Sequence, residues 1–173
     1  KEIELANSLG IETVVTDHHE PAEELPKALA VVDCKRKDNK YPFNGLAGVG
    51  VAFKLIQAIS IKLGIKEEEY LKYLDLVCVG TISDIVPLVD ENRTISKLGL
   101  RLVKQTKNIG LKVLLDSIGY QKIDSNTISF GVAPRINACG RMGHEKEALD
   151  LFLTNNIEDA QKIPQNLNQY NMA

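Results

Sequence analysis

The sequence predicts an α/β fold in which a partial parallel sheet is flanked by helices and followed by a helical second half. The chain has 173 residues, of which 44% are apolar, so it is long enough to enclose a hydrophobic core. A β-branched run at residues 13–16 has the composition of a strand. The order helix, strand, strand and then helices only is typical of an α/β chain with a helical end.

The first elements are a helix, two short strands and a loop. Apolar residues at helical spacing predict a helix over residues 2–9, and Gly10 is a suitable helix end. The β-branched run predicts a strand at 13–16, and an apolar run predicts a second at 29–32. Basic residues with proline and an Asn-Gly pair predict a loop over 34–45.

Two apolar helices are expected next. Residues 47–63 carry apolar side chains on nearly all sides, which predicts a largely buried helix. A second helix is expected to run from Tyr70 to about Asp84 and to stop before Pro87. This helix delivers a carboxylate at its end.

Helical patterns continue to the end of the chain. They cover residues 92–105 and 110–118, with Gly119 as the cap of the second. The segment from Lys146 onward has helical propensity, but Pro164 is expected to interrupt it, because proline costs about 3 kcal/mol inside a helix.

The composition excludes several classes of protein. The 21 basic and 23 acidic residues give a net charge of −2, so any nucleic-acid role must rest on local geometry. No apolar run approaches the roughly 20 residues of a membrane span, and the acidic start does not resemble a secretory signal. The three distant cysteines predict neither a disulfide framework nor structural zinc, which fits a reducing cytoplasm, and Cys78 is interpreted as a buried hydrophobe.

Asp17, His18 and His19 directly follow the first predicted strand. The carboxyl ends of strands are where open α/β sheets place ligand groups. Imidazole and carboxylate together suit manganese, iron or zinc. The alternative is a solvated turn with a capping aspartate, since adjacent histidines in a strand point to opposite faces.

Asp84 is a lone acid among apolar residues, in the stretch Gly-Thr-Ile-Ser-Asp-Ile-Val-Pro-Leu. Burying an unpaired carboxylate is costly, so Asp84 requires a cation, an arginine or several N–H groups. A metal ion shared with His18 would satisfy it. A simple aspartate at a helix end is the alternative.

Two further segments suit anions. Arg135, Asn137 and Arg141 lie in one short stretch, and arginine presents a planar fork that matches phosphate oxygens. A surface loop whose arginines pair with acids is the alternative. The glycine-rich residues 45–50 at a helix start offer backbone N–H groups, although close helix packing explains these glycines equally well.

Taken together, these segments resemble the DHH phosphoesterase superfamily and, within it, the RecJ family of single-strand-specific DNA exonucleases. The resemblance lies in four stretches in the same order: Val-Thr-Asp-His-His-Glu (15–20), Leu-Ala-Gly-Val-Gly-Val-Ala-Phe-Lys-Leu (46–55), residues 80–88 and Ala-Pro-Arg-Ile-Asn-Ala-Cys-Gly-Arg-Met (133–142). Four ordered segments are far more specific than the Asp-His-His tripeptide alone.

The resemblance implies a role for each candidate residue. His18 and Asp84 would be metal ligands for Mn²⁺ or Mg²⁺, two ions being held in the intact enzyme. Asp17 would support the site, and His19 would approach the scissile phosphate. The substrate-phosphate clamp would consist of Arg135, Asn137 and Arg141. The implied reaction is removal of nucleotides from the 5′ end of single-stranded DNA, in the 5′→3′ direction, during recombination and repair.

The resemblance also implies a division of the chain. Residues 1–155 would form a partial DHH phosphoesterase domain, and residues 156–173 would begin a helix that connects to a further domain. The upstream aspartates and downstream domains of the family are not in this sequence. We therefore expect a fragment of the catalytic core that is inactive alone.

Two other functions remain open from the sequence. One is a different DHH phosphoesterase, acting on oligonucleotides or cyclic dinucleotides. The other is a non-catalytic module that binds nucleotides or DNA and does not need metal.

Overall fold

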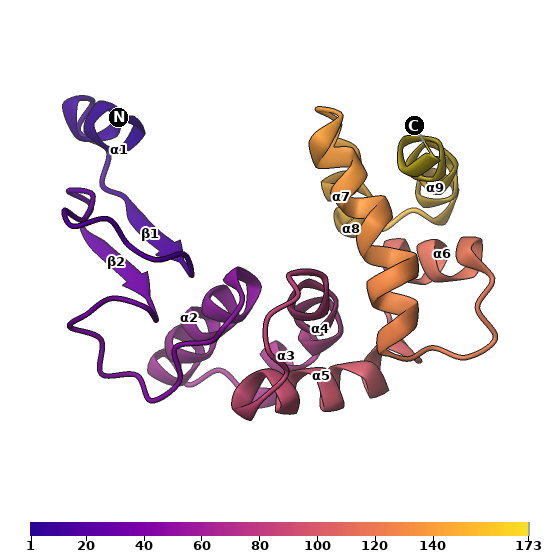
Figure 1. Cartoon of the computed structure of the whole chain (residues 1–173), viewed down its shortest axis with the longest axis horizontal. Coiled ribbons are helices and arrows are strands. Elements are labelled where there is room, and N and C mark those ends of the chain that lie inside the picture. Colours follow the sequence, from indigo (N-terminus) through magenta and orange to yellow (C-terminus); the bar gives the residue numbers. More distant parts are fainter. Residues whose placement is uncertain (173) are drawn as a thin grey trace.

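The computed structural model describes residues 1–172, which form a small parallel sheet and a series of helices. In Figure 1 these elements follow an open arc, with the sheet at one end and the last helices at the other. In chain order they are α1 (Glu2–Ser8), β1 (Val14–Asp17), β2 (Ala30–Asp33), α2 (Gly48–Leu63), α3 (Glu67–Leu71), α4 (Leu74–Ser83), α5 (Asp90–Val103), α6 (Ile109–Ile118), the π-helical turn η1 (Thr127–Val132), α7 (Ala133–Arg141), α8 (Glu145–Leu153) and α9 (Ile157–Met172).

The sheet consists of β1 and β2, paired in parallel with Val14 opposite Ala30 and Asp17 opposite Asp33. Both strands therefore end in an aspartate at the same edge of the sheet. The helix α2 packs against β1. The predicted α/β class, with a parallel sheet and a helical second half, is confirmed.

The helix α4 lies between two hydrophobic clusters. One cluster joins β2 to α2, α3 and α5, and α4 contributes Leu74 and Val77 to it. The other occupies the helical second half, and α4 contributes Cys78, Val79 and Ile82. Opposite sides of α4 are thus buried in different clusters, which explains why apolar residues occupy most of its sides.

The prediction that the helix at 47–63 is largely buried is wrong. Only Gly50, Val51, Phe53 and Ser60 of α2 are buried, and Ile61 is 73% exposed. The described residues pack on α2 from the side of β1, α3 and α4. The apolar pattern correctly indicated a helix, but it did not show how many neighbours cover it.

Two further expectations need correction. The helix expected from Tyr70 to Asp84 is divided into α3 and α4, and the break lets Tyr70 pack edge-on against Phe53 at a centroid distance of 6.2 Å. Pro164 does not interrupt α9, which is continuous through it. The ring of Pro164 is buried on the same side as Ala160 and Leu167, and this burial offsets the missing N–H donor.

Other predictions are confirmed by the helix ends. Asp84 caps the C-terminus of α4, and Gly119 ends α6 in the left-handed conformation, with φ of 74°.

The three cysteines are free and buried within the described residues, as expected for Cys78. No helix in residues 1–172 has the length and apolar character needed to cross a bilayer. The expected domain boundary at residue 155 falls between α8 and α9. Because α9 packs on α6, α7 and α8, it is not separated from the preceding helices, and this boundary stays a prediction.

Candidate metal and phosphate site

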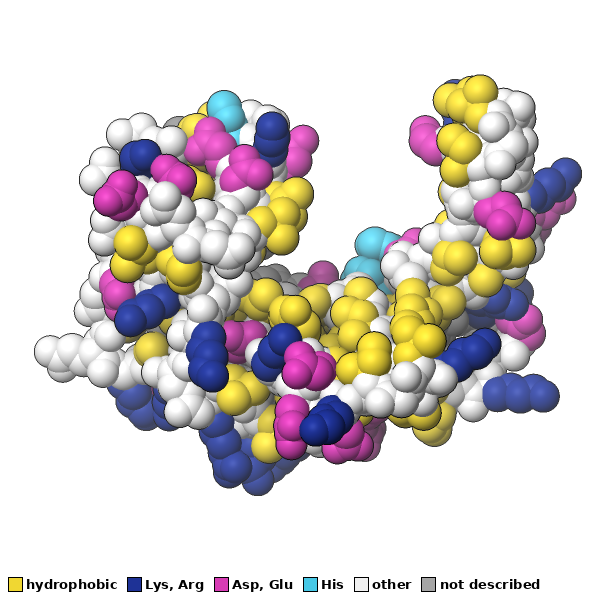
Figure 2. Space-filling model, turned by 180° about the vertical axis from the view of Figure 1, so that it is seen from behind, with side chains coloured by type: hydrophobic (Ala, Val, Ile, Leu, Met, Phe, Trp, Pro, Cys, Tyr) yellow, Lys and Arg dark blue, Asp and Glu magenta, His cyan; other side chains and the backbone are white. Residues whose placement is uncertain are grey.

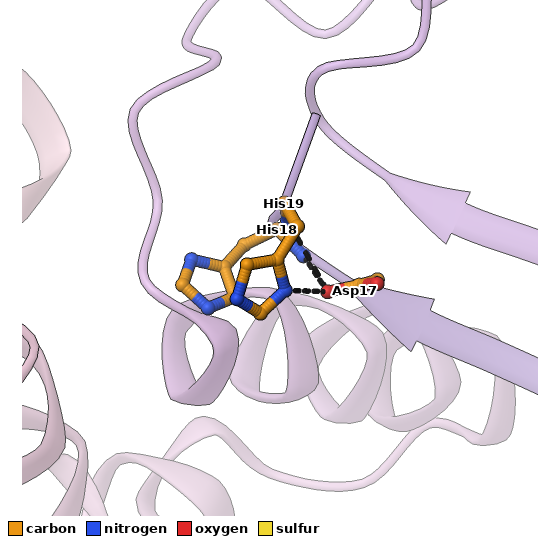
Figure 3. A group of neighbouring side chains, drawn as sticks. All are labelled: Asp17, His18 and His19. Carbon is orange, nitrogen blue, oxygen red and sulfur yellow. Dashed lines mark hydrogen bonds and ion pairs between the residues drawn. The ribbon is translucent and has the colours of Figure 1, made fainter. Parts of the chain in front are cut away.

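Asp17 and His19 form a hydrogen-bonded pair at the carboxyl end of β1 (Figure 3). His19 Nδ1 lies 2.7 Å from Asp17 Oδ1, and the same oxygen accepts the backbone N–H groups of His18 at 2.7 Å and His19 at 3.2 Å. The hydrogen bond from the His19 side chain, followed by that from the His18 backbone, lowers the pKa of Asp17 to about 2. Asp17 is therefore ionised at neutral pH and orients the His19 ring.

The His18 ring lies beside the His19 ring, with a centroid distance of 4.4 Å, and also approaches the end of α4. Its Nδ1 lies 3.5 Å from Asp84 Oδ2, and its side chain is 19% exposed. The ring also rests against the start of α2, where a Cβ atom added to Gly48 would come within 3.1 Å of His18 Cδ2. The end of β1, the start of α2 and the end of α4 therefore meet at one imidazole.

His18, Gly48 and Asp84 line one pocket of about 460 Å³. Its walls come from the end of β1, the start of α2, one side of α4, and from α7 and α8. His18, Gly48, Ser83, Asp84 and Asn137 are among its lining residues. Figure 2 shows the molecule deeply hollowed between the two ends of the arc, with histidine atoms visible on the floor of the hollow.

The residues around His18 fit a divalent metal ion. Asp17, His18 and His19 offer ligand atoms that all lie within 4.8 Å of one another. Two atoms that bind one ion at about 2.1 Å are roughly 3–3.5 Å apart, which matches the separation of His18 Nδ1 and Asp84 Oδ2. Ser83 Oγ is buried beside them and has no hydrogen-bond partner among residues 1–172. A bound ion with its water molecules would supply one.

The start of α2 adds backbone donors to the pocket. Ala47 precedes the first turn and has no side chain that can cap it, and Ala47, Gly48 and Val49 all line the pocket. Uncapped N–H groups and the positive end of the helix dipole favour an anion at this position. Residues 47–49 of the glycine-rich stretch thus form a part of the pocket wall that suits an anion.

The three residues expected to form a phosphate clamp do not all lie on the same side of α7. Asn137 lines the pocket. Arg141 follows it by four residues, about 40° around the helix, and its side chain is exposed. Arg135 Nε instead donates to Asn168 Oδ1 of α9 at 2.5 Å, and its Nη1 donates to the Gly131 carbonyl at 2.7 Å. The expectation that both guanidiniums face the pocket together is not met, because residues six apart are separated by about 120° around a helix.

Ser83 and Gly48 have contacts in the pocket that sequence reasoning did not show. Ser83 precedes Asp84, and serine in a mostly apolar helix carries no distinctive signal. Gly48 belongs to the glycine-rich stretch, where helix packing was an equal explanation. Its role as the contact for His18 became visible only through the spatial arrangement.

Comparison with known proteins identifies similar chains. Residues 1–81 match the DHH family, N-terminal domain. The chain is 42% identical over 172 residues to the single-stranded-DNA-specific exonuclease RecJ of Bacillus subtilis (strain 168), covering 98% of this chain and 21% of that protein. It is 35% identical over 183 residues to the RecJ exonuclease of Escherichia coli (strain K12), covering 99% of this chain and 32% of that protein.

Solved structures show the same similarity in three dimensions. The crystal structure of RecJ in complex with Mn²⁺ from Thermus thermophilus matches with a TM-score of 0.85 and 37% identity, over 98% of this chain and 26% of that one. RecJ in complex with Mg²⁺ from the same organism matches with a TM-score of 0.78 and 36% identity, over 94% and 24%. The chain spans 21–32% of the length of the two curated RecJ relatives.

Proposed function

Since the chain belongs to the RecJ family of DHH proteins, we propose that it provides metal-binding and phosphate-binding residues of a single-strand-specific DNA exonuclease. The observation that carries this proposal is the approach of His18 and Asp84 to 3.5 Å in a pocket that is also lined by the uncapped start of α2. Imidazole and carboxylate favour a divalent ion, and the helix start favours an anion.

In this proposal His18 and Asp84 hold Mn²⁺ or Mg²⁺, with two ions in the intact enzyme. Solved RecJ structures with each of these metals support the choice. Divalent ions, when bound, make water a better nucleophile and neutralise the charge on the leaving oxygen. Asp17 fixes the His19 ring by its hydrogen bond to Nδ1, so that His19 Nε2 remains free to approach the scissile phosphate.

The phosphate contacts come from two helices. The N–H groups at the start of α2 receive the phosphate nearest the metal site, and Asn137 and Arg141 contact it from α7. Arg135 acts indirectly, because its bonds to Asn168 and Gly131 hold α7 against α9 and so position Asn137. The proposed substrate is single-stranded DNA, degraded from its 5′ end.

We also propose that the chain does not degrade DNA by itself. The metal-ligand cluster found in residues 1–172 contains Asp17, His18 and His19, and Asp84 approaches His18 to 3.5 Å. Two ions about 4 Å apart require more ligands than these four side chains offer. We keep the cytoplasm as the expected compartment, and the three free thiols suit its reducing conditions.

The test places the chain in an active enzyme. The chain replaces the matching segment of the Bacillus subtilis RecJ exonuclease, and 5′-labelled and 3′-labelled single-stranded DNA are digested with and without Mn²⁺. We expect Mn²⁺-dependent loss of nucleotides from the 5′ end, absent in Asp84→Ala. The matched control is Asp116→Ala, an exposed acid on α6 outside the pocket, which should retain activity.

Two results would contradict the proposal. One is digestion that proceeds equally without divalent ions, and the other is full activity of Asp84→Ala. Digestion of cyclic dinucleotides or short oligonucleotides alone would assign a different substrate. Binding of DNA without any hydrolysis would favour a non-catalytic module.

A further inference from the structure

Asn92 joins two loops that flank the candidate site. It lies in the first turn of α5 and is completely buried. Its Nδ2 donates to the Gly45 carbonyl at 2.6 Å and to the Pro87 carbonyl at 3.0 Å. Because both partners are acceptors, the amide nitrogen must face them. Asn92 thus uses both of its donors to connect segments that are far apart in sequence.

Each of these loops carries one half of the site. Gly45 lies just before α2, and the first residue of that helix, Gly48, is in contact with the His18 ring. Pro87 lies three residues after Asp84. The hydrogen bonds of Asn92 therefore connect the support of the imidazole to the turn that follows the carboxylate.

The turn that follows Asp84 is strained. Ile85 has φ of 59° and Asp90 has φ of 44°, both in the left-handed region. This region is unfavourable for a β-branched residue, and the Ile85 side chain is 89% exposed, so burial does not compensate it. A strained conformation persists only where its surroundings determine it. The bond from Asn92 to the Pro87 carbonyl is a constraint of this kind.

Glu91 connects the same helix turn to α2 at the surface. It pairs with Lys54 at 2.6 Å and accepts a hydrogen bond from the Tyr41 hydroxyl at 2.5 Å. The Glu91 and Lys54 side chains are each about one-third exposed, and such pairs contribute little. The fully buried amide of Asn92 is the stronger constraint, since breaking its bonds leaves two carbonyls unpaired.

We propose that Asn92 is a positioning residue for the metal site. It fixes the strained turn against the loop before α2, and it thereby sets the separation of His18 and Asp84. The inference rests on the proposed function, in which these two side chains share a divalent ion. Asn92 does not touch the pocket itself, because it is not among the lining residues.

The first experiment compares variants in the 173-residue chain. Asn92→Leu removes both donors and keeps the number and branching of the side-chain heavy atoms. Its control is Thr127→Val, which removes a buried hydroxyl that donates to the Lys122 carbonyl at 2.8 Å in the other half of the molecule. Mn²⁺ affinity is measured by electron paramagnetic resonance at a temperature where circular dichroism shows each variant to be folded. We expect at least tenfold weaker binding for Asn92→Leu and a change below twofold for Thr127→Val.

A rescue variant separates positioning from general stability. Glycine adopts the φ of Ile85 without strain. In Asn92→Leu the strain at Ile85 drives the turn to relax and to move Asp84. In the double variant Asn92→Leu/Ile85→Gly this strain is absent, so the turn keeps its conformation without the bonds of Asn92. We expect Ile85→Gly alone to bind Mn²⁺ like the wild type, and the double variant to regain most of the lost affinity.

A readout without metal keeps this inference separate from the proposed function. In the metal-free chain with ¹³C-labelled histidine, the His18 ring resonances should shift in Asn92→Leu and stay unchanged in Thr127→Val. Unchanged His18 resonances, or equal Mn²⁺ losses in Asn92→Leu and Thr127→Val, would overturn the positioning role. Shifted resonances with Mn²⁺ binding that is independent of Asp84 would support positioning and contradict the proposed metal site.

Discussion

His18 Nδ1 lies 3.5 Å from Asp84 Oδ2, although the two residues come from the ends of different elements, β1 and α4. This separation is longer than a strong hydrogen bond and suits two ligands of one ion. It depends on the close approach of His18 to Gly48, on the position of α4 between two hydrophobic clusters, and on the turn after Asp84. Single substitutions can disturb each of these three features separately.

Gly48→Ala should separate metal binding from helix stability. The added Cβ comes within 3.1 Å of His18 Cδ2, so the imidazole must shift by a few tenths of an ångström. We expect Mn²⁺ affinity to fall several-fold, while alanine raises helix propensity by up to about 0.5–1 kcal/mol. Gly140→Ala in the last turn of α7 is the control, because its Cβ meets nothing within 4 Å. Equal affinities of the two variants, measured by calorimetry, would contradict the role of Gly48.

Arg141→Ala should weaken DNA binding, whereas Arg135→Ala should lower the stability of the fold. Arg141 is exposed one helical turn beyond Asn137, so its loss should weaken binding of single-stranded DNA in the chimeric RecJ without changing the thermal midpoint. Arg135 holds Asn168 and the Gly131 carbonyl, so its loss should cost about 1.5–3 kcal/mol of folding free energy. Filter binding and urea unfolding distinguish the two. An unaltered stability of Arg135→Ala would show that these bonds are not needed to hold α7.

Gly110→Ala should destabilise the helical half strongly. A Cβ atom at this position would overlap the backbone carbonyl of Leu151, because α6 and α8 cross in close contact there. Relief requires the helices to move apart, which costs about 1–3 kcal/mol or more. Urea unfolding should show this loss, with Gly140→Ala as a control that is neutral or stabilising. A stable Gly110→Ala variant would mean that the two helices do not approach as described.

The buried thiols predict a loss of stability at alkaline pH. Burial raises the pKa of Cys78 from the ordinary value of 9.0 to about 12, and it raises the pKa of Cys34 and Cys139 as well. Well below pH 9 the thiols are protonated in both states. Above pH 9 the unfolded chain ionises first, so the free energy of unfolding should fall as pH rises toward 12, by at most about 1.4 kcal/mol per pH unit for Cys78.

Urea unfolding between pH 8.5 and 10 in the presence of a reductant measures this effect. Cys78→Ala should be less stable at pH 8.5 because of the cavity, but its stability should decline less steeply with pH. A wild-type profile as flat as that of Cys78→Ala would show that Cys78 is not shielded from solvent. Rapid alkylation of Cys78 in the folded chain at pH 8 would lead to the same conclusion.

Much of the fold could be predicted because local signals agree with the tertiary structure. The β-branched run before Asp17 and the glycine after α6 are determined locally, and both appear as expected. The exposure of α2 could not be predicted, because an apolar helix does not show which neighbours cover it. Pro164 was misjudged for a similar reason, since only the packing of α9 shows that the proline ring is buried.

The candidate site was predictable in part. The location of Asp17, His18 and His19 at a strand end follows from a general rule of α/β sheets, and Asp84 stood out as a lone acid in an apolar stretch. The separation of Arg135 from Asn137 was not foreseen, although the helical period already places residues two apart on different sides. The partner of Arg135, Asn168, lies far along the chain and carries no local signal.

The most direct test of the central claim is a Mn²⁺ titration of the metal-free chain with ¹³C-labelled histidine, followed by NMR. The chain has three histidines, and His144, which stacks on Tyr170 in the helical half, is the internal reference. If His18 and Asp84 share an ion, the His18 resonances broaden at Mn²⁺ concentrations that leave His144 unchanged, and Asp84→Ala removes this selectivity. Equal broadening of His18 and His144, or selective broadening that persists in Asp84→Ala, would contradict the assignment.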